Sequence, residues 1–309
     1  MFHSANPAAT VEAKQLLASL YKVKGVCTLS GQHNQMWHMS EVSDKVAEIC
    51  GHYPLVWGGE WGFSDERNDI DNVKYRPRLL DEIRRHHDAG RIIVMTYHQA
   101  SPTVGEPCDF QGGVIANLSD SEWLDVLAPT SAMHGVWRDH VSRLAVAFQV
   151  LQSESIPIIF RPYHEMNGDW FWWGGDVSCF KALWNQTYEL FTNEFGLNNL
   201  LWAWNCDRPW PGVEEFYPGH ETVDLLGTDI YPLEGRDEVY PQEWYDRMVA
   251  IAEGRPIALS EFSVMPTDAQ LVSQPWSYFM AWDDLVLREN SDERIKEVFA
   301  NERVGHTFK

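Results

Sequence analysis

The chain has 309 residues, of which 44% are hydrophobic and 22% are charged, so it can bury a large core and should be soluble. Its formal net charge of −21 repels phosphate backbones and anionic membrane surfaces, which argues against nucleic acid and membrane partners. The sequence has no stretch of about 18 apolar residues, so no membrane span is predicted.

The N-terminus, MFHSANPAAT, lacks the basic and apolar regions of a signal peptide. We therefore expect either a cytoplasmic protein or a secreted one whose leader has already been removed. The five cysteines are odd in number and scattered, without a CxxC pair, so neither a zinc site nor a disulfide framework is predicted. They are Cys27, Cys50, Cys108, Cys179 and Cys206.

Eight short apolar runs have the length and composition expected of buried strands. They are Val26–Leu29, Pro54–Trp57, Arg91–Thr96, Ile156–Phe160, Asn199–Trp204, Val223–Ile230, Pro256–Leu259 and Trp276–Trp282. Stretches with the apolar spacing of helices separate most of them. These are Glu41–Cys50, Pro77–Ala89, Met133–Gln152, Phe180–Phe195, Gln242–Ala252 and Asp284–Ala300.

Two further connections, Glu214–Phe216 and Asp268–Ser273, have room for only a turn of helix. Strands that alternate with helices favour a parallel sheet, and eight such units in a chain of this length favour a closed (β/α)8 TIM barrel. The prediction is an α/β protein with one catalytic barrel domain over residues 1–309. A doubly wound open sheet is the alternative, and the missing dinucleotide glycine fingerprint counts against it.

One connection is unusually long. It runs from Gln99 to Ser131 and includes a short helical piece, Asp120–Leu127. Loops of this length inside a compact domain are commonly functional. The segment is therefore interpreted as a wall beside a cleft, with a purely structural excursion as the alternative.

Polar and aromatic residues follow every predicted strand, and in a TIM barrel the catalytic residues lie at those strand ends. They are Gln32 and His33, Glu60 and Trp61, His98, His164 and Glu165, Asn205, Asp229 and Tyr231, Glu261, and Trp282. Any one of them could be structural. Their common placement predicts one shared site.

The stretch after the fourth run is the most informative part of the chain. It reads RPYHEMNGDWFWWGG and places Arg161, His164 and Glu165 just before four large aromatic residues. A carboxyl group facing aromatic rings suits an enzyme that holds a sugar ring and protonates it, and the chain's 15 tryptophans agree with sugar binding. The alternative is an Arg161–Glu165 ion pair capped by a hydrophobic loop.

Glycosidic bonds are broken by two carboxyl groups on opposite sides of the bond. Glu165 and Glu261 follow the fourth and seventh runs, which face one another across a barrel mouth. Because both are held at strand ends, we expect the short separation of about 5–5.5 Å that allows direct attack, rather than the separation of about 6.5–9.5 Å that admits a water. For Glu261 alone, a structural ion pair with Arg161 or another cation is the alternative.

The motif RPYHEMNGDWFWWGG resembles the acid/base motif of glycoside hydrolase family 26, best known for β-mannanases. The resemblance extends from Ser30-Gly31-Gln32-His33 to Trp282 and implies a retaining double displacement. It implies that Glu165 of HEMNG is the acid/base and Glu261 of ALSEF the nucleophile. Burial among aromatic rings should raise the pKa of Glu165 and keep it protonated.

The resemblance also implies the sugar contacts. Tyr231 should hydrogen-bond the nucleophile, His98 and His164 should contact sugar, and Trp170 and Trp282 should stack on it. We add Trp173 and Asn205 as substrate-binding candidates from their places in the aromatic loop and at a strand end. Tyr97 and Ser260 depart from the family pattern, which usually has Trp and Thr there.

The predicted activity is therefore hydrolysis of β-1,4-mannosidic bonds in mannan, galactomannan or manno-oligosaccharides by a monomer, without a cofactor or metal. Mixed-linkage β-1,3-1,4-glucan and β-1,3-xylan remain alternative substrates within the family. A metal-dependent hydrolase using His98, His164 and Asp229, and a non-catalytic carbohydrate-binding barrel, are the alternatives from other classes.

Overall fold

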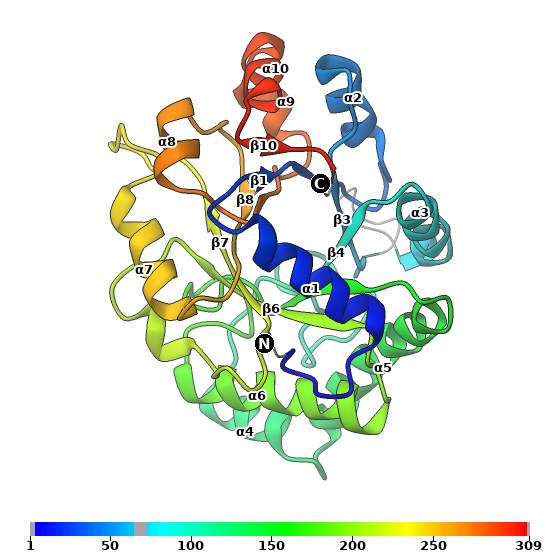
Figure 1. Ribbon diagram of the computed structural model, residues 1–309. Helices are drawn as coiled ribbons and strands as arrows, with labels where there is room; N and C mark the ends of the chain where they lie inside the picture. The colour runs from blue at the N-terminus through cyan, green and yellow to red at the C-terminus, as the bar shows by residue number, and fades with distance from the viewer. Residues whose placement is uncertain (1–3, 65–72, 308–309) are drawn as a thin grey trace.

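The computed structural model describes residues 4–64 and 73–307 (Figure 1). The first three residues of the N-terminal segment discussed above lie outside this range. The described strands form one sheet in which every pairing between strands is parallel. They are β1 (Thr28–Leu29), β2 (Gly31–His33), β3 (Val56–Glu60), β4 (Ile92–Tyr97), β5 (Ile158–Pro162), β6 (Leu200–Asp207), β7 (Leu225–Ile230), β8 (Ile257–Phe262), β9 (Tyr278–Phe279) and β10 (Val304–Gly305).

The sheet closes through its first two strands. Neighbours follow the order β2, β3, β4, β5, β6, β7, β8, β9, and β1 then pairs with β9. Because only Ser30 separates β1 from β2, the stretch Thr28–His33 joins the two ends of the sheet. A further bridge between Gln32 and Ala281 lies at the same seam. The predicted (β/α)8 barrel is confirmed.

Helices surround the barrel and connect its strands (Figure 1). They are α1 (Val11–Val23), α2 (Glu41–Cys50), η1 (Val73–Tyr75), α3 (Arg76–Asp88), α4 (Asp120–Leu127), α5 (Ala132–Ser153), α6 (Val177–Glu189), η2 (Leu190–Glu194), η3 (Val213–Phe216), α7 (Gln242–Ala252), α8 (Asp268–Ser273), α9 (Leu285–Glu289) and α10 (Asp292–Ala300). The bounds predicted for α2, α4, α7 and α8 are confirmed to the residue.

The predicted helices Pro77–Ala89 and Met133–Gln152 differ from α3 and α5 by one residue at each end, and two others differ in their course. The stretch Asp284–Ala300 is two helices, because Ser291 caps α10 by accepting a hydrogen bond from the Arg294 amide and so starts a new helix. The stretch Phe180–Phe195 continues from α6 into the π-helical turn η2. Neither the N-terminal helix α1 nor the short strand β10, which pairs beside β1, was predicted.

Most predicted strands end too early. For example, β3 continues to Glu60 and β6 to Asp207, whereas the apolar runs stop at Trp57 and Trp204. An apolar run ends at the first polar side chain. The backbone hydrogen bonds between neighbouring strands continue beyond that point, because polar side chains at the barrel mouth have hydrogen-bond partners there. The opposite error affects the eighth run, where only Tyr278–Phe279 pair as a strand.

Helix α1 covers the N-terminal end of the barrel, and Figure 1 shows it lying across the ring of strands. Its buried residues Ala13, Leu16, Leu17 and Leu20 pack in one cluster with barrel residues such as Ile159. This end of the barrel is therefore closed by apolar packing, which leaves the opposite end for chemistry.

The barrel interior changes from apolar to polar along each strand. Side chains two residues apart face the same side of a sheet. Thus Ile159 lies in the apolar cluster and Arg161 in the polar layer above it, and Ala203 and Asn205 repeat the pattern. Gly227 is needed in this layer, because a Cβ there would lie 2.2 Å from both Asn205 Oδ1 and Ser260 Oγ.

The long connection after β4 packs against the aromatic loop that follows β5. The Trp172 amide donates to the Val114 carbonyl at 3.3 Å, and the Ala116 amide donates to the Trp170 carbonyl at 3.2 Å. The Trp172 indole N–H donates to the Gln99 carbonyl at 2.8 Å. The connection therefore supports the aromatic loop from outside.

Within the part of the chain that the structure describes, no helix has both the length and the apolar content needed to cross a membrane. Cys50, Cys108 and Cys206 are buried, and Cys27 and Cys179 are partly exposed.

Candidate active site

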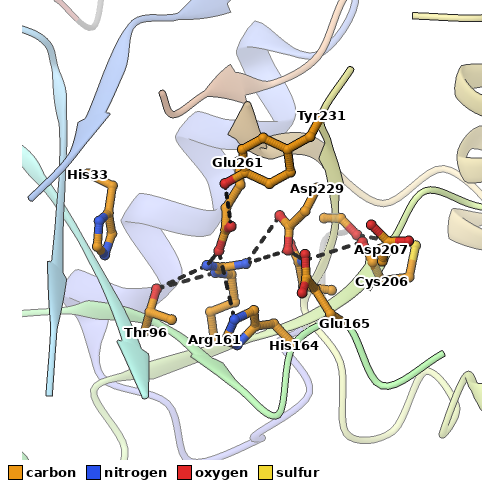
Figure 2. A network of polar contacts seen from close by, with 12 residues as sticks. His33, Thr96, Arg161, His164, Glu165, Cys206, Asp207, Asp229, Tyr231 and Glu261 are labelled. Atoms are coloured by element: carbon orange, nitrogen blue, oxygen red, sulfur yellow. Dashed lines mark hydrogen bonds and ion pairs between the residues drawn. The ribbon is translucent and has the colours of Figure 1, made fainter. Parts of the chain in front are cut away.

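Arg161 occupies the centre of the barrel mouth (Figure 2). Its guanidinium donates to Asp229 Oδ2 at 3.0 Å, to Thr96 Oγ1 at 3.2 Å, and to Glu261 Oε1. Burial alone would lower the pKa of Arg161, but the Asp229 and Glu261 carboxylates raise it above its ordinary value. Arg161 is therefore a fixed cation that pairs with Asp229 and Glu261, so the alternative of an Arg161–Glu165 ion pair is wrong.

Glu261 lies at the end of β8 with two strong donors. Besides Arg161, the Tyr231 hydroxyl donates to Glu261 Oε2 at 2.8 Å, as predicted. The β7–β8 register shifts between Thr228 and Asp229, and such an irregularity re-aims side chains at the rim of a barrel. A guanidinium and a phenol therefore both donate to the Glu261 carboxyl group and fix its orientation.

Glu165 lies just beyond β5 in a different electrostatic setting. The Trp170 indole N–H donates to its Oε2 at 2.9 Å. Burial raises the pKa of Glu165 well above its ordinary value, and the negative charges of Asp229, Glu261 and Asp207 raise it further, against the Trp170 hydrogen bond. The expected rise in the pKa of Glu165 is confirmed in direction, and neighbouring carboxylates contribute to it as well as burial.

The backbone at Glu165 is unusual. Tyr163 and Glu165 have φ angles of 50° and 55°, in the left-handed region that residues other than glycine seldom occupy. The Glu165 amide donates to the Asn205 carbonyl at 2.8 Å, which anchors this turn to β6. Strained backbone of this kind occurs at functional sites when the surroundings hold it in place.

The two glutamates lie close together. One carboxylate oxygen each from Glu165, Asp229 and Glu261 lie within 4.8 Å of one another. This agrees with the predicted short separation, at which one carboxylate can attack the sugar directly. Three carboxylates at this spacing could also hold a cation, but the Arg161 guanidinium already neutralises Asp229 and Glu261.

Histidines line one side of the site. His98 Nδ1 lies 3.0 Å from Glu60 Oε2, so Glu60 orients that ring. Burial lowers the pKa of both His33 and His164 well below the ordinary value, and the Arg161 charge lowers it further. Both rings are therefore neutral and can exchange hydrogen bonds with hydroxyl groups.

The predicted tryptophans have distinct places. Trp282 stacks on the His33 ring at 3.8 Å between ring centroids and is partly exposed at the mouth. Trp170 is also partly exposed. Trp173 is fully buried, and its indole N–H donates to the His164 carbonyl at 2.8 Å. The expectation that Trp173 contacts substrate is corrected, because it packs behind His164 and offers no surface.

Asn205 is likewise fully buried. Its Nδ2 donates to Asp229 Oδ2 at 2.6 Å, so Asn205 holds the carboxylate that pairs with Arg161. Its side chain supports the site by positioning Asp229, which corrects the expectation of a direct sugar contact.

The predicted residues that lie at the barrel mouth are Glu165, Glu261, Tyr231, His164, His98, Trp170 and Trp282.

Sequence reasoning missed a group of residues next to Glu165. They are Asn167, Asp207, Arg208 and Trp210, and they surround a hollow on the far side of Trp170. Burial raises the pKa of Asp207 to about 6, against the lowering effect of Arg208. Because β6 continues to Asp207, the rule that strand ends carry function would have found this group if the strand had been given its full length.

A TIM barrel whose mouth brings two glutamates together, one bonded to a guanidinium and a phenol and the other with a raised pKa, is a glycosidase-type barrel. The sequence profile of Glycosyl hydrolase family 26 matches residues 5–305. The chain belongs to that family.

Individual relatives agree with this assignment. The GH26A protein of a Muricauda species has a structure with a TM-score of 0.89 and 36% identity, and the match covers 97% of each chain. The Podospora anserina GH26-CBM35 β-(1,4)-mannanase gives a TM-score of 0.81 and 27% identity, covering 98% of this chain and 67% of that one. A mannan endo-1,4-β-mannosidase from Thermothelomyces thermophilus is 27% identical over 97% of this chain. The present chain spans 61% of the length of that fungal protein.

Proposed function

We propose that this chain hydrolyses β-1,4-mannosidic bonds in mannan, galactomannan or manno-oligosaccharides with retention of configuration. The observation that carries the proposal is the close approach of Glu165 and Glu261, within 4.8 Å, in opposite electrostatic settings. The choice of mannan is supported by the relatives that are mannan endo-1,4-β-mannosidases. One closed barrel, completed by the β1–β2 stretch near the N-terminus, supports a single catalytic domain.

In the first step, Glu261 attacks the anomeric carbon of the sugar. The glycosidic C–O bond breaks, and Glu165 donates its proton to the leaving oxygen, which departs as a sugar hydroxyl. Arg161 and Tyr231 donate hydrogen bonds to Glu261 and hold its carboxyl group in position before the attack. Preorganised charges of this kind need no rearrangement during the reaction.

In the second step, water releases the sugar from Glu261. The bound Glu261 is an uncharged ester, so its contribution to the raised pKa of Glu165 disappears. The pKa of Glu165 then falls, and the group takes a proton from the attacking water. The carboxylate of Glu261 is regenerated, and the product keeps the β configuration of the substrate.

The other residues at the mouth bind and position the sugar. Trp170 and Trp282 present partly exposed rings that can stack on it. His164 Nε2 lies 3.8 Å from Glu261 Oε1, so His164 is placed to contact a sugar bonded to Glu261. His98, held by Glu60, forms the neighbouring wall.

A panel of glycans with product-length analysis tests the proposed function. The chain should cleave β-1,4-mannan and manno-oligosaccharides and act much more slowly on mixed-linkage β-1,3-1,4-glucan and β-1,3-xylan. A higher kcat/KM on either of those two polysaccharides would replace mannan as the substrate. Loss of activity after chelator treatment would favour the metal-dependent alternative.

Trp170 should make two contributions to catalysis, a ring that stacks on the sugar and a hydrogen bond to Glu165, and two substitutions can distinguish them. Trp170→Phe removes the donor that lowers the pKa of Glu165, so that pKa should rise further. Because the acid works in its protonated form, the alkaline limb of the kcat/KM profile should move to higher pH. Trp170→Ala also removes the stacking surface and should reduce kcat/KM by a further factor of about ten.

The control for both Trp170 variants is Cys27→Ser. The Cys27 thiol is partly exposed and lies next to Gly305 of β10. The pH profile and kcat/KM of this control should match those of the wild type. If the alkaline limb of Trp170→Phe stays in place or moves to lower pH, the hydrogen bond from Trp170 does not control the acid.

A further inference from the structure

The turn that carries Glu165 is held in an unfavourable backbone conformation. Tyr163 and Glu165 have positive φ angles of 50° and 55°, although neither residue is a glycine. Such a conformation persists only where the surrounding contacts hold it. The contacts of Tyr163 therefore bear on the position of the acid two residues later.

The two ends of this turn are held in different ways. At the Glu165 end the backbone is tied directly, because the Glu165 amide donates to the Asn205 carbonyl at 2.8 Å and the Trp173 indole donates to the His164 carbonyl at 2.8 Å. At the other end the Tyr163 side chain is the anchor. It is 1% exposed, and its ring packs behind the mouth with its centroid 5.9 Å from that of Trp173.

The Tyr163 hydroxyl joins two outer helices. The Trp137 indole N–H of α5 donates to it at 3.0 Å, and Thr187 Oγ1 of α6 lies 3.0 Å from it. Thr187 donates its own hydroxyl proton to the Leu183 carbonyl at 2.9 Å. The Tyr163 O–H therefore donates to Thr187, and the chain of hydrogen bonds runs in one direction, from α5 through Tyr163 to α6.

These two hydrogen bonds fix the depth and the angle of the Tyr163 ring. Burial raises the pKa of Tyr163 to about 12, so the hydroxyl keeps its proton near neutral pH. A buried polar group without a partner is costly, and a ring in another position would leave the Tyr163 hydroxyl and the Trp137 indole unpaired. The ring in turn fixes the backbone of the turn through its Cβ.

The position of the turn matters because the pKa of Glu165 depends on its surroundings. Burial and the charges of Asp229 and Glu261 raise that pKa. A looser turn would let the Glu165 carboxyl group move toward solvent, which weakens both effects and lowers the pKa. The same movement would take the acid out of line with the leaving oxygen, and misplacement by about 1 Å is enough to slow a reaction substantially.

We propose that Tyr163 is a positioning residue for the acid, and that its hydrogen bonds to Trp137 and Thr187 anchor the left-handed turn and hold Glu165 in place beside Glu261. The inference rests on the proposed function, in which Glu165 gives and takes the proton. Because Tyr163 is buried behind the mouth, it acts on the reaction through the turn and not through the substrate.

The test is Tyr163→Phe, which keeps the ring and removes both hydrogen bonds. On mannohexaose, whose leaving oxygen needs a proton, kcat/KM should fall about tenfold. On a 2,4-dinitrophenyl β-mannoside, whose leaving group needs no proton, kcat/KM should stay close to the wild-type value. Because the acid works in its protonated form and its pKa falls, the alkaline limb of the mannohexaose profile should move to lower pH, opposite to the shift expected for Trp170→Phe.

A second variant and a control accompany this test. Thr187→Val removes only the acceptor of the Tyr163 hydroxyl, so the alkaline limb should move in the same direction by a smaller amount. Combined with Tyr163→Phe it should move the limb no further, since both changes break the same hydrogen bond. The matched control is Tyr240→Phe, because Tyr240 is similarly buried and its hydroxyl donates to the Val264 carbonyl. It should lower the unfolding temperature and leave the pH profile unchanged.

Two results would overturn the inference while leaving the proposed function intact. One is a lower unfolding temperature in Tyr163→Phe and Thr187→Val with the alkaline limb in its wild-type place, which reduces Tyr163 to a packing role. The other is an equal fall in kcat/KM on both substrates. If Tyr163→Phe does not fold, the pH profile of Thr187→Val decides. If the wild type itself fails to cleave mannohexaose, the proposed function is wrong and the inference falls with it.

Discussion

Glu261→Ala should abolish turnover on every substrate, including aryl glycosides with activated leaving groups. No glycosyl-enzyme can form without this carboxylate, and the neighbouring Asp229 is held by Arg161 and Asn205. The expected loss in kcat is about 10⁴-fold or more, which corresponds to about 5.4 kcal/mol of transition-state stabilisation. Steady-state kinetics on mannohexaose and on a 2,4-dinitrophenyl β-mannoside measure it.

The control is Glu293→Ala, which removes an exposed carboxylate on α10. Its kinetics should equal those of the wild type. Because Arg161 keeps its ion pair with Asp229, Glu261→Ala should remain folded, which thermal unfolding checks. Retention of more than about 1% of wild-type turnover on the aryl mannoside would show that another group is the nucleophile.

Glu165→Ala should behave differently on different leaving groups. On mannohexaose the departing alkoxide needs a proton, so kcat/KM should fall by about 10²–10⁴-fold. On a 2,4-dinitrophenyl β-mannoside the leaving group departs without a proton, so the first step should be largely spared. The second step should then become rate-limiting, because no base activates the water, and a burst of released dinitrophenol should precede slow turnover.

Azide provides the decisive comparison for this variant. As a small anion that needs no general base, it should attack the glycosyl-enzyme, accelerate turnover of Glu165→Ala and yield the β-mannosyl azide. The wild type should not respond, since its water is already activated. If Glu165→Ala shows no burst and no azide response, the roles assigned to Glu165 and Glu261 are wrong.

The catalytic pair could be predicted from the sequence because both glutamates follow strongly apolar runs. The run Ile156–Phe160 and the run Pro256–Leu259 are each interrupted by charge within a few residues, and the barrel topology brings such strand ends together. The hydrogen bond from Tyr231 to Glu261 could also be predicted, since Tyr231 follows the adjacent strand.

The partners of Arg161 could not be predicted from local spacing. Arg161 and Glu165 are four residues apart, but Arg161 points into the barrel while the left-handed turn at Tyr163 and Glu165 carries the acid over the rim. The contribution of Asp229 and Asp207 to the pKa of Glu165 depends on that turn as well. Long-range geometry therefore decides which carboxylates act on the pKa of Glu165.

The tryptophans of the aromatic loop differ in burial, and the sequence did not indicate which of them would be exposed. Trp170, Trp172 and Trp173 stand in one motif, yet only Trp170 reaches the mouth. The structure also explains why residue 168 is glycine, because a Cβ there would lie 2.3 Å from the Trp170 ring. Glycine at this position allows the ring to fold back toward Glu165.

The stereochemistry of the first product tests the central claim most directly. Two glutamates within 4.8 Å allow direct attack and a double displacement, so cleavage of mannohexaose should first yield reducing ends in the β configuration. Proton NMR recorded within the first minutes should show the β anomeric signal alone, with the α signal growing later by mutarotation. If the α signal appears first, water attacks the sugar directly, and Glu261 is not the nucleophile.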